Sequence, residues 1–199
     1  MVNSPSIIEE KVFTMKIYIF RHGQTDWNAV NRIQGREDIP LNDNGRAQAR
    51  ETGRAVKGKI HPAYMLVSPL SRARETGEII AGYIGVDKIY EEYNLIECSY
   101  GEMSGKIVPD IYGFVCPDEE PWEQASARFL SVLDKYVKLS TDDFAVVSHG
   151  GTINATLYAI SGGKVGTGIT KLKNAGITVL EYTDGVYTID KFDIPASEF

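Results

Sequence analysis

The sequence predicts an α/β fold: a mainly parallel central sheet with helices on both faces and a C-terminal antiparallel hairpin. Short runs of β-branched and aromatic residues predict three buried strands, at residues 16–20, 63–67 and 144–148. Helical segments separate these strands, and such alternation is typical of a parallel sheet. Residues 177–182 and 186–192 flank Asp184-Gly185, a two-residue turn that joins antiparallel strands.

Four segments are predicted to be helical, at residues 43–56, 71–84, 122–139 and 152–160. In the third, apolar side chains recur at every fourth residue, at Ala125, Phe129, Leu133 and Val137, which predicts one buried face. One hydrophobic core accounts for a chain of 199 residues, so we expect a single domain over residues 15–199. Residues 1–14 are interpreted as an extension, a mis-assigned start or an expression remnant.

Charge and composition argue against several classes of partner. A formal net charge of −6 is a poor match for nucleic acid or an anionic membrane, because both require a basic face. No apolar run reaches the length of about 18 residues that a membrane span requires. Cys98 and Cys116 belong to no C-x-x-C pair, and Glu9 and Glu10 stand where a signal peptide would be basic. We therefore expect a cytoplasmic protein with reduced thiols.

Two of the three histidines directly follow predicted strands and precede glycine, in Arg21-His22-Gly23 and at His149. The carboxyl ends of parallel strands meet at one edge of the sheet, where ligands of such folds bind. Either histidine alone is better explained as a hydrogen-bonded turn residue. The pair beside Arg21 instead indicates phosphate chemistry, because guanidinium binds phosphate oxygens in a fork and neutral imidazole can attack phosphorus.

An arginine and a glutamate elsewhere in the chain extend this set. Arg72 lies in the first turn of the helix predicted over residues 71–84, where a cation opposes the helix dipole unless an anion is present. Glu97 follows a short apolar run and precedes the long irregular segment 98–121. A carboxyl held near like charge and out of water can keep a proton for an alkoxide leaving group. Each residue alone is explained as well by solvent exposure.

Together these segments resemble the histidine phosphatase superfamily, which includes cofactor-dependent phosphoglycerate mutases, fructose-2,6-bisphosphatases and broad-specificity phosphatases. The pattern is closest to the group of broad-specificity phosphatases, alpha-ribazole phosphatases and fructose-2,6-bisphosphatases. The matching motifs span about residues 15–182 and are Arg21-His22-Gly23, Asp26-Trp27-Asn28, Gln34-Gly35, Arg72, Glu97 before Tyr100-Gly101, and Ser148-His149-Gly150-Gly151. The resemblance implies a phosphoglycerate mutase-like three-layer fold.

The resemblance also implies a ping-pong route, in which His22 attacks phosphorus and Glu97 protonates the departing alcohol and then activates water. Arg21, Arg72 and His149 would hold the equatorial oxygens of the phosphoryl group. For this, His149 is expected to be cationic and His22 neutral. Further phosphate or substrate contacts are implied for Asn28, Gly150, Thr25, Gln34 and Gly35. No metal and no cofactor are implied.

Other phosphatase chemistries do not fit the chain. A Cys-x5-Arg nucleophile fails because Ser104 and Trp122 stand six residues after the two cysteines. No Asp-x-Asp pair suggests an aspartyl-phosphate enzyme, and no histidine-rich cluster suggests a two-metal site. The sequence therefore favours a metal-independent enzyme with a phosphohistidine intermediate.

The segment 98–121, interpreted as a lid, favours hydrolysis over mutase activity. From Cys98 to Ala127 the only cation is Lys106, against six acids: Glu102, Asp110, Asp118, Glu119, Glu120 and Glu123. An acidic surface repels a doubly phosphorylated intermediate. The lid also carries aromatic residues and a methionine, which could accept a less charged monoester or could simply pack the lid on the body: Tyr100, Met103, Tyr112, Phe114 and Trp122.

We therefore expect a phosphomonoester hydrolase acting on a small phosphorylated metabolite. The alternatives are a cofactor-dependent phosphoglycerate mutase and a non-catalytic phosphate-binding regulatory module. A homodimer is possible, because the free edge of the predicted hairpin can pair with another chain.

Overall fold

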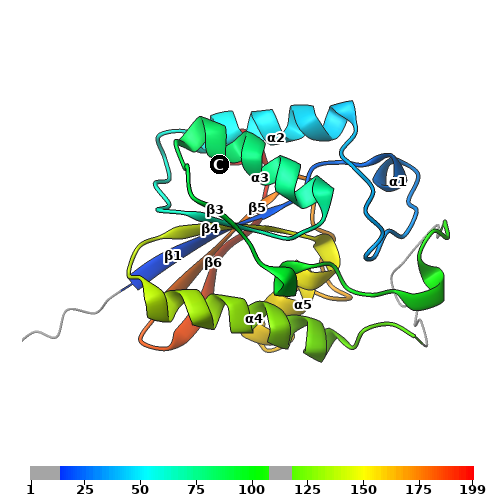
Figure 1. Ribbon diagram of the computed structural model, residues 1–199. Helices are drawn as coiled ribbons and strands as arrows, with labels where there is room; N and C mark the ends of the chain where they lie inside the picture. Colours follow the sequence, from blue (N-terminus) through cyan, green and yellow to red (C-terminus); the bar gives the residue numbers. More distant parts are fainter. Residues whose placement is uncertain (1–13, 108–117) are drawn as a thin grey trace, which may run out of the picture.

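The computed structural model describes residues 14–107 and 118–199 and contains one six-stranded sheet with the order β3-β2-β4-β1-β5-β6 (Figure 1). The strands are β1 (Thr14–Arg21), β2 (Met65–Val67), β3 (Ile89–Glu91), β4 (Phe144–Ser148), β5 (Ile177–Thr183) and β6 (Val186–Ile194). Strands β1 to β4 pair in parallel, whereas β5 pairs antiparallel with both β1 and β6. The predicted fold class is confirmed. The short, half-exposed β3 was not predicted.

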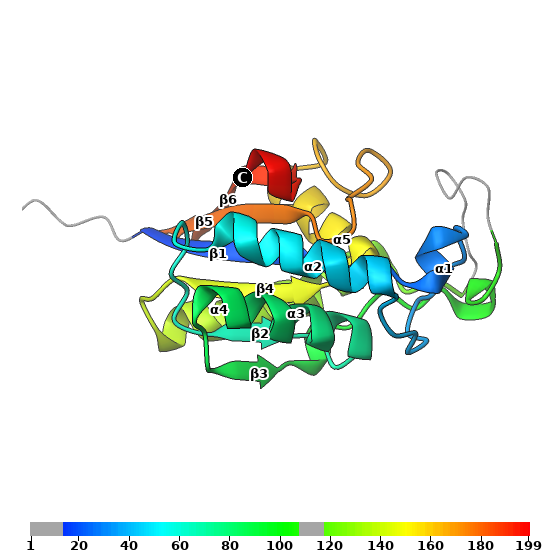
Figure 2. The same ribbon diagram turned by 90° about the horizontal axis from the view of Figure 1, so that it is seen from above.

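Four long helices cover the sheet, with α2 and α3 on one face and α4 and α5 on the other (Figure 1). Seen from above, α2 and α3 lie side by side across the sheet (Figure 2). The helices are α1 (Asp26–Ala29), α2 (Asp43–Val56), α3 (Ser71–Ile84), α4 (Trp122–Leu139) and α5 (Gly150–Ser161). Three 3-10 helices are η1 (Tyr93–Leu95), η2 (Gly101–Met103) and η3 (Ala196–Glu198). Helix α1 was not predicted, and α5 begins two residues earlier than expected.

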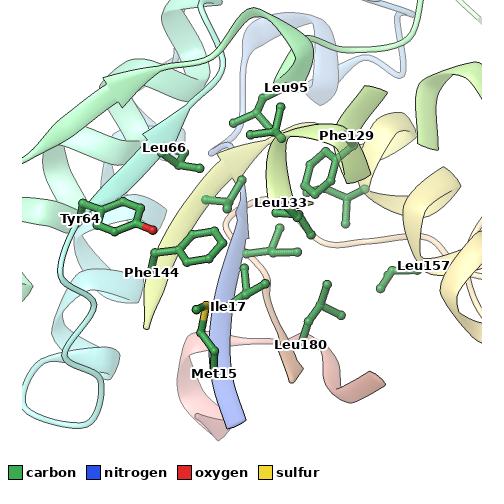
Figure 3. Packing of buried hydrophobic residues seen from close by; sticks show 14 of the residues in the cluster. Met15, Ile17, Tyr64, Leu66, Leu95, Phe129, Leu133, Phe144, Leu157 and Leu180 are labelled. Carbon is green, nitrogen blue, oxygen red and sulfur yellow. The ribbon is translucent and has the colours of Figure 1, made fainter. Parts of the chain in front are cut away.

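The core consists of two apolar layers, one on each face of the sheet. Alternation along β1 sends Ile17 and Ile19 toward α4 and α5, and Tyr18 and Phe20 toward α2 and α3. Figure 3 shows the first layer, in which Phe129 and Leu133 of α4 pack with strand side chains such as Ile17. Because both faces are packed, the central strands are fixed in register and their ends form a rigid edge.

The parallel register aligns the carboxyl ends of three strands. Arg21 at the end of β1 pairs with Ser148 at the end of β4, and Val67 of β2 pairs with Val147. His22, Ser68 and His149 therefore leave the sheet at the same edge.

Some sequence expectations fall on residues outside the described ranges. These are residues 1–13 and, in the lid segment, residues 108–117, which include Tyr112, Phe114 and Cys116. In the described part of the chain, no helix combines the length and apolar character needed to cross a bilayer.

Candidate active site

His22 and His149 face each other at the carboxyl edge of the sheet, with ring centroids 5.1 Å apart. Both side chains are almost completely buried, at 2% and 0% exposure. The backbone N–H of His22 donates to Ser148 O at 3.0 Å, which extends the pairing of β1 with β4 by one residue. The sheet therefore fixes the separation of the two rings.

His22 has a defined tautomer and is neutral. Its Nδ1 lies 2.6 Å from Gly23 O, and because a carbonyl only accepts, Nδ1 must carry the hydrogen. The lone pair of the ring is then on Nε2. Burial lowers the pKa of His22 well below its usual value, and the positive charges of Arg72 and Arg21 lower it further. A neutral imidazole with a free Nε2 is the form that can attack phosphorus.

Gly23 lets the loop after β1 close against α2. A Cβ atom at this position would lie 2.4 Å from Gly45 O, closer than packed atoms approach. The Gly23 N–H donates to the Thr76 hydroxyl of α3 at 3.0 Å. Glycine is therefore required here by close backbone approach.

The surroundings of His149 determine its charge. Its Nε2 lies 2.7 Å from the Ser68 hydroxyl, and its buried Nδ1 has no hydrogen-bond partner. Burial, Arg72 and the neighbouring His22 together lower its pKa well below the usual value. In the unliganded protein the imidazole of His149 is therefore neutral, because burial and the nearby guanidiniums oppose a further positive charge. The expectation that His149 is cationic when it holds phosphate stays a prediction. The negative charge of a bound phosphate dianion would raise the pKa of His149.

Arg72 is a buried cation at the start of α3, with 1% exposure. Its two terminal nitrogens donate to Glu37 O at 2.7 Å and to Gly35 O at 2.8 Å, while its Nε is buried without a partner. Burial lowers its pKa to about 10, and Glu97 opposes that shift. The side chain therefore stays cationic at neutral pH and is held in one orientation by the loop that contains Gly35.

Arg21 approaches the same site from the end of β1. It donates to Leu172 O through Nη1, and its Nε is buried without a partner. A Cβ atom on Gly150 would lie 3.1 Å from this Nε, so a glycine allows α5 to begin directly against the guanidinium. Burial lowers the pKa of Arg21, and Glu97 is the first charge to oppose the shift.

Unpartnered buried nitrogens are concentrated here. Five buried side-chain polar atoms lack a partner in the described part of the chain, and three of them are Arg21 Nε, Arg72 Nε and His149 Nδ1. Buried polar groups are nearly always hydrogen-bonded, because leaving one unpaired costs about 1–3 kcal/mol. Three such groups in one site suit a ligand that accepts several hydrogen bonds.

Glu97 lies at the positive end of α5 and accepts four hydrogen bonds. Its Oε1 accepts from Cys98 N at 2.8 Å and Thr152 N at 2.9 Å. The Thr152 hydroxyl lies 3.0 Å from Oε1 and shares its one hydrogen between Oε1 and Ile96 O at 2.9 Å. Its Oε2 accepts from Gly151 N at 3.1 Å. The sequence suggested a carboxyl beside like charge. The structure instead surrounds it with donors at a helix N-terminus, and Oε2, which among the described residues accepts only the Gly151 N–H, is the oxygen with acceptor capacity left.

The five side chains thus come from four separate parts of the chain and share one electrostatic environment. Residues 17–195 match the family model described as histidine phosphatase superfamily (branch 1). The chain belongs to the histidine phosphatase superfamily.

Related sequences and structures agree with this histidine phosphatase assignment. The uncharacterized phosphatase PhoE of Bacillus subtilis is 36% identical over 187 residues, which cover 89% of this chain and 94% of that protein. A phosphoglycerate mutase of Bacillus anthracis has the same fold, with a TM-score of 0.82, 24% identity and coverage of 94% and 96% of the two chains. A variant phosphoserine phosphatase of Entamoeba histolytica, solved with phosphoserine, gives a TM-score of 0.73 at 25% identity, covering 90% and 96%. The chain is an enzyme of the histidine phosphatase type.

The remaining predicted contacts of this histidine phosphatase cluster around α1. Thr25 is fully buried and caps α1, accepting from Asn28 N at 3.1 Å, and its hydroxyl lies 2.9 Å from Gln34 Oε1. Asn28 Oδ1 accepts from Thr25 N at 3.2 Å, which leaves its NH₂ group to donate elsewhere. Gly35 lies beside the lid, where an added Cβ would approach Tyr100 within 3.3 Å. The hydroxyl of Thr25 is thus committed to local structure, and its substrate role stays a prediction.

Asn174 is a site residue that the sequence analysis missed. Its Nδ2 donates to His22 O at 3.1 Å and to Asn28 Oδ1 at 3.3 Å. It precedes β5, and because β5 is antiparallel to β1, the beginning of β5 lies at the edge where β1 ends. The available signal was the polar turn before the predicted hairpin, in which Ala175 has a φ of +56°.

The described part of the lid packs on the site. A Cβ atom on Gly151 would lie 2.4 Å from the Tyr100 hydroxyl, and burial together with Glu97 raises the pKa of Tyr100 well above its usual value. Glu120, one of the six acids assigned to the region from Cys98 to Ala127, is paired with Arg36 and Arg128 and does not act as a free negative charge. Trp122 begins α4 and is 41% exposed. Within residues 14–107 and 118–199, no group of three or more acidic, histidine or cysteine side chains is arranged to hold a metal ion.

Proposed function

We propose that this chain is a metal-independent phosphomonoester hydrolase that forms a phosphohistidine at His22. The observation that supports this most directly is the hydrogen bond of 2.6 Å from His22 Nδ1 to Gly23 O, which directs the lone pair to Nε2. Nε2 attacks phosphorus in line, the bond from phosphorus to the ester oxygen breaks, and Glu97 gives a proton to the departing alkoxide. Water then attacks the phosphorus, Glu97 takes its proton, the bond from phosphorus to Nε2 breaks, and inorganic phosphate leaves.

Transition-state charge would be stabilised by the chain's own cations. Arg21 and Arg72 place buried guanidiniums beside His22, and each has an unpartnered Nε. His149 adds a third unpartnered nitrogen. Preorganised donors in a desolvated site account for much of the catalysis in phosphoryl transfer. Arginines would supply here the positive charge that metal ions supply in other phosphatases.

Trapping the intermediate tests the mechanism. Protein incubated with a ³²P-labelled monoester and quenched should carry one acid-labile, alkali-stable label. The label should disappear in His22→Asn and persist in His61→Ala, because His61 is the exposed third histidine and lies outside the site. Chelator treatment should leave turnover unchanged. Absence of the label in the wild type, or its survival in His22→Asn, would overturn the mechanism and favour a phosphate-binding module.

We further propose that the substrate is a small phosphorylated metabolite and that hydrolysis predominates over mutase activity. The acidic lid disfavours a bisphosphate, and the similar Bacillus subtilis protein is named a phosphatase. Phosphoserine belongs in a test panel because a structurally similar enzyme was solved with it. A panel of monoesters ranked by kcat/KM identifies the class. Rapid formation of 2-phosphoglycerate from 3-phosphoglycerate with catalytic 2,3-bisphosphoglycerate would instead show a mutase.

A further inference from the structure

Arg128 projects from α4 behind Glu97 and uses every hydrogen of its guanidinium. Nη1 donates to Asn94 O at 2.7 Å and to Ile96 O at 2.5 Å. Nε and Nη2 donate to the two carboxylate oxygens of Glu120 at 2.8 and 3.0 Å, and Nη2 also donates to the Thr152 hydroxyl at 3.2 Å. Five donors in a rigid plane are a property that only arginine has.

These contacts bind the Glu97 segment from both sides. On the carboxylate side, Arg128 donates to the Thr152 hydroxyl, whose single hydrogen is shared between Glu97 Oε1 at 3.0 Å and Ile96 O at 2.9 Å. On the backbone side, Glu120 accepts from Ser99 N at 3.3 Å. Arg36 joins the same carboxylate at 3.2 Å and donates through Nε to Glu97 O at 3.2 Å. The peptide groups just before and after Glu97 are therefore held by one ion cluster.

Within the ion cluster, Arg128 and Glu120 are largely buried, so their contacts hold the Glu97 segment more firmly than surface contacts would. The side chains of Arg128 and Glu120 are only 14% and 11% exposed. Burial alone would raise the pKa of Glu120, but hydrogen bonds and charge from Arg128 hold it below its usual value. A forked, partly desolvated pair of this kind restricts both partners more than a surface ion pair does.

We propose that Arg128, supported by Glu120, is a positioning residue that orients Glu97 for proton transfer. This rests on the proposed function, in which a carboxyl oxygen of Glu97 must meet the leaving-group oxygen. Proton transfer depends steeply on geometry, and a displacement of about 1 Å can reduce a rate by about 100-fold. Arg128 itself does not touch the phosphoryl group.

Leaving-group dependence separates positioning from a merely structural role. A p-nitrophenolate departs without a proton, whereas the alkoxide of phosphoserine needs one. In Arg128→Lys and Arg128→Met, kcat/KM for phosphoserine or another alkyl monoester that the wild type hydrolyses should fall at least about tenfold. With p-nitrophenyl phosphate, kcat/KM should stay within about twofold, because it reports phosphorylation of His22. Turnover should then show a nitrophenol burst, since hydrolysis of the phosphoenzyme still needs Glu97 as base.

Matched variants keep this test decisive. Arg74→Met removes a surface arginine that is paired with Glu91 at 3.7 Å, and kcat/KM should stay unchanged for both substrates. Arg128→Lys retains the charge with fewer donors, and Glu120→Gln is a milder change if Arg128→Met does not fold. Equal losses on both substrates, or no loss on either, would overturn the positioning role while leaving the phosphatase intact. A wild type inactive on all monoesters would overturn the proposed function and this role together.

Discussion

Replacing Arg72 by methionine should separate the cost of a buried cation from its use in catalysis. The guanidinium is 1% exposed and donates two hydrogen bonds to backbone carbonyls, at 2.7 and 2.8 Å. Hydrogen bonds from charged groups contribute about 1.5–3 kcal/mol each. Removal also relieves repulsion with Arg21. We therefore expect Arg72→Met to lower the free energy of unfolding by only about 1–3 kcal/mol, less than the two bonds alone would suggest.

The same substitution should change the site histidines and the rate. Arg72 is the leading charge that lowers the pKa of both His22 and His149, so its removal should raise both pKa values toward the usual range. Loss of one oxyanion donor should reduce kcat by about 100- to 1,000-fold. Arg72→Lys keeps the charge but not the fork, so the histidine pKa values should stay low while the rate remains depressed.

Three measurements check this reasoning: NMR titration of the imidazoles, denaturant unfolding, and initial rates with p-nitrophenyl phosphate. The electrostatic account would be refuted by histidine pKa values in Arg72→Met equal to those of the wild type. Full activity in Arg72→Lys would show that bidentate geometry is unimportant.

Three further predictions concern pH, the missed asparagine and backbone approach. Both site histidines have lowered pKa values when folded, so the unfolded chain binds protons below about pH 6.5 that the native state excludes. Stability should therefore fall from pH 7 to 5, by at most about 1.4 kcal/mol per pH unit per histidine, and His149→Asn should reduce this slope in denaturant titrations. Asn174→Asp removes the donor to His22 O and Asn28 Oδ1 and sets a carboxylate oxygen against both acceptors. We expect kcat to drop about tenfold or more and the melting temperature to fall, whereas unchanged kinetics would contradict a role for these contacts. A Cβ atom added at Gly82 of α3 would have no other atom within 4 Å, so Gly82→Ala should stabilise the protein by about 0.5–1 kcal/mol. Gly23→Ala should destabilise it and abolish activity. Changes of the same sign for both variants in calorimetry would refute the steric argument.

Local patterns were enough to predict most of the regular structure. Helices α2, α3 and α4 have the predicted bounds, because the amphipathic period of a helix depends only on residues close together in the sequence. Helix α2 also begins with a side-chain cap from Asn42. The misses are short elements. Helix α1 has four residues and β3 has three, too few for a period to be visible. A capping box between Thr25 and Asn28 holds α1, and β3 forms by pairing in parallel with β2.

Residue types and spacing also determined which chemistry was available. Histidine after two strands, with Arg21, Arg72 and Glu97, was readable because parallel strands end at one edge. Only the tertiary structure decided the states of these groups. Burial first, and then the charge of Arg72 from a distant segment, lower the pKa of His149 and keep it neutral. Glu97 is an acceptor because α5 begins beside it. Protonation and orientation depend on burial and on neighbours brought together by folding, and no stretch of sequence contains that information by itself.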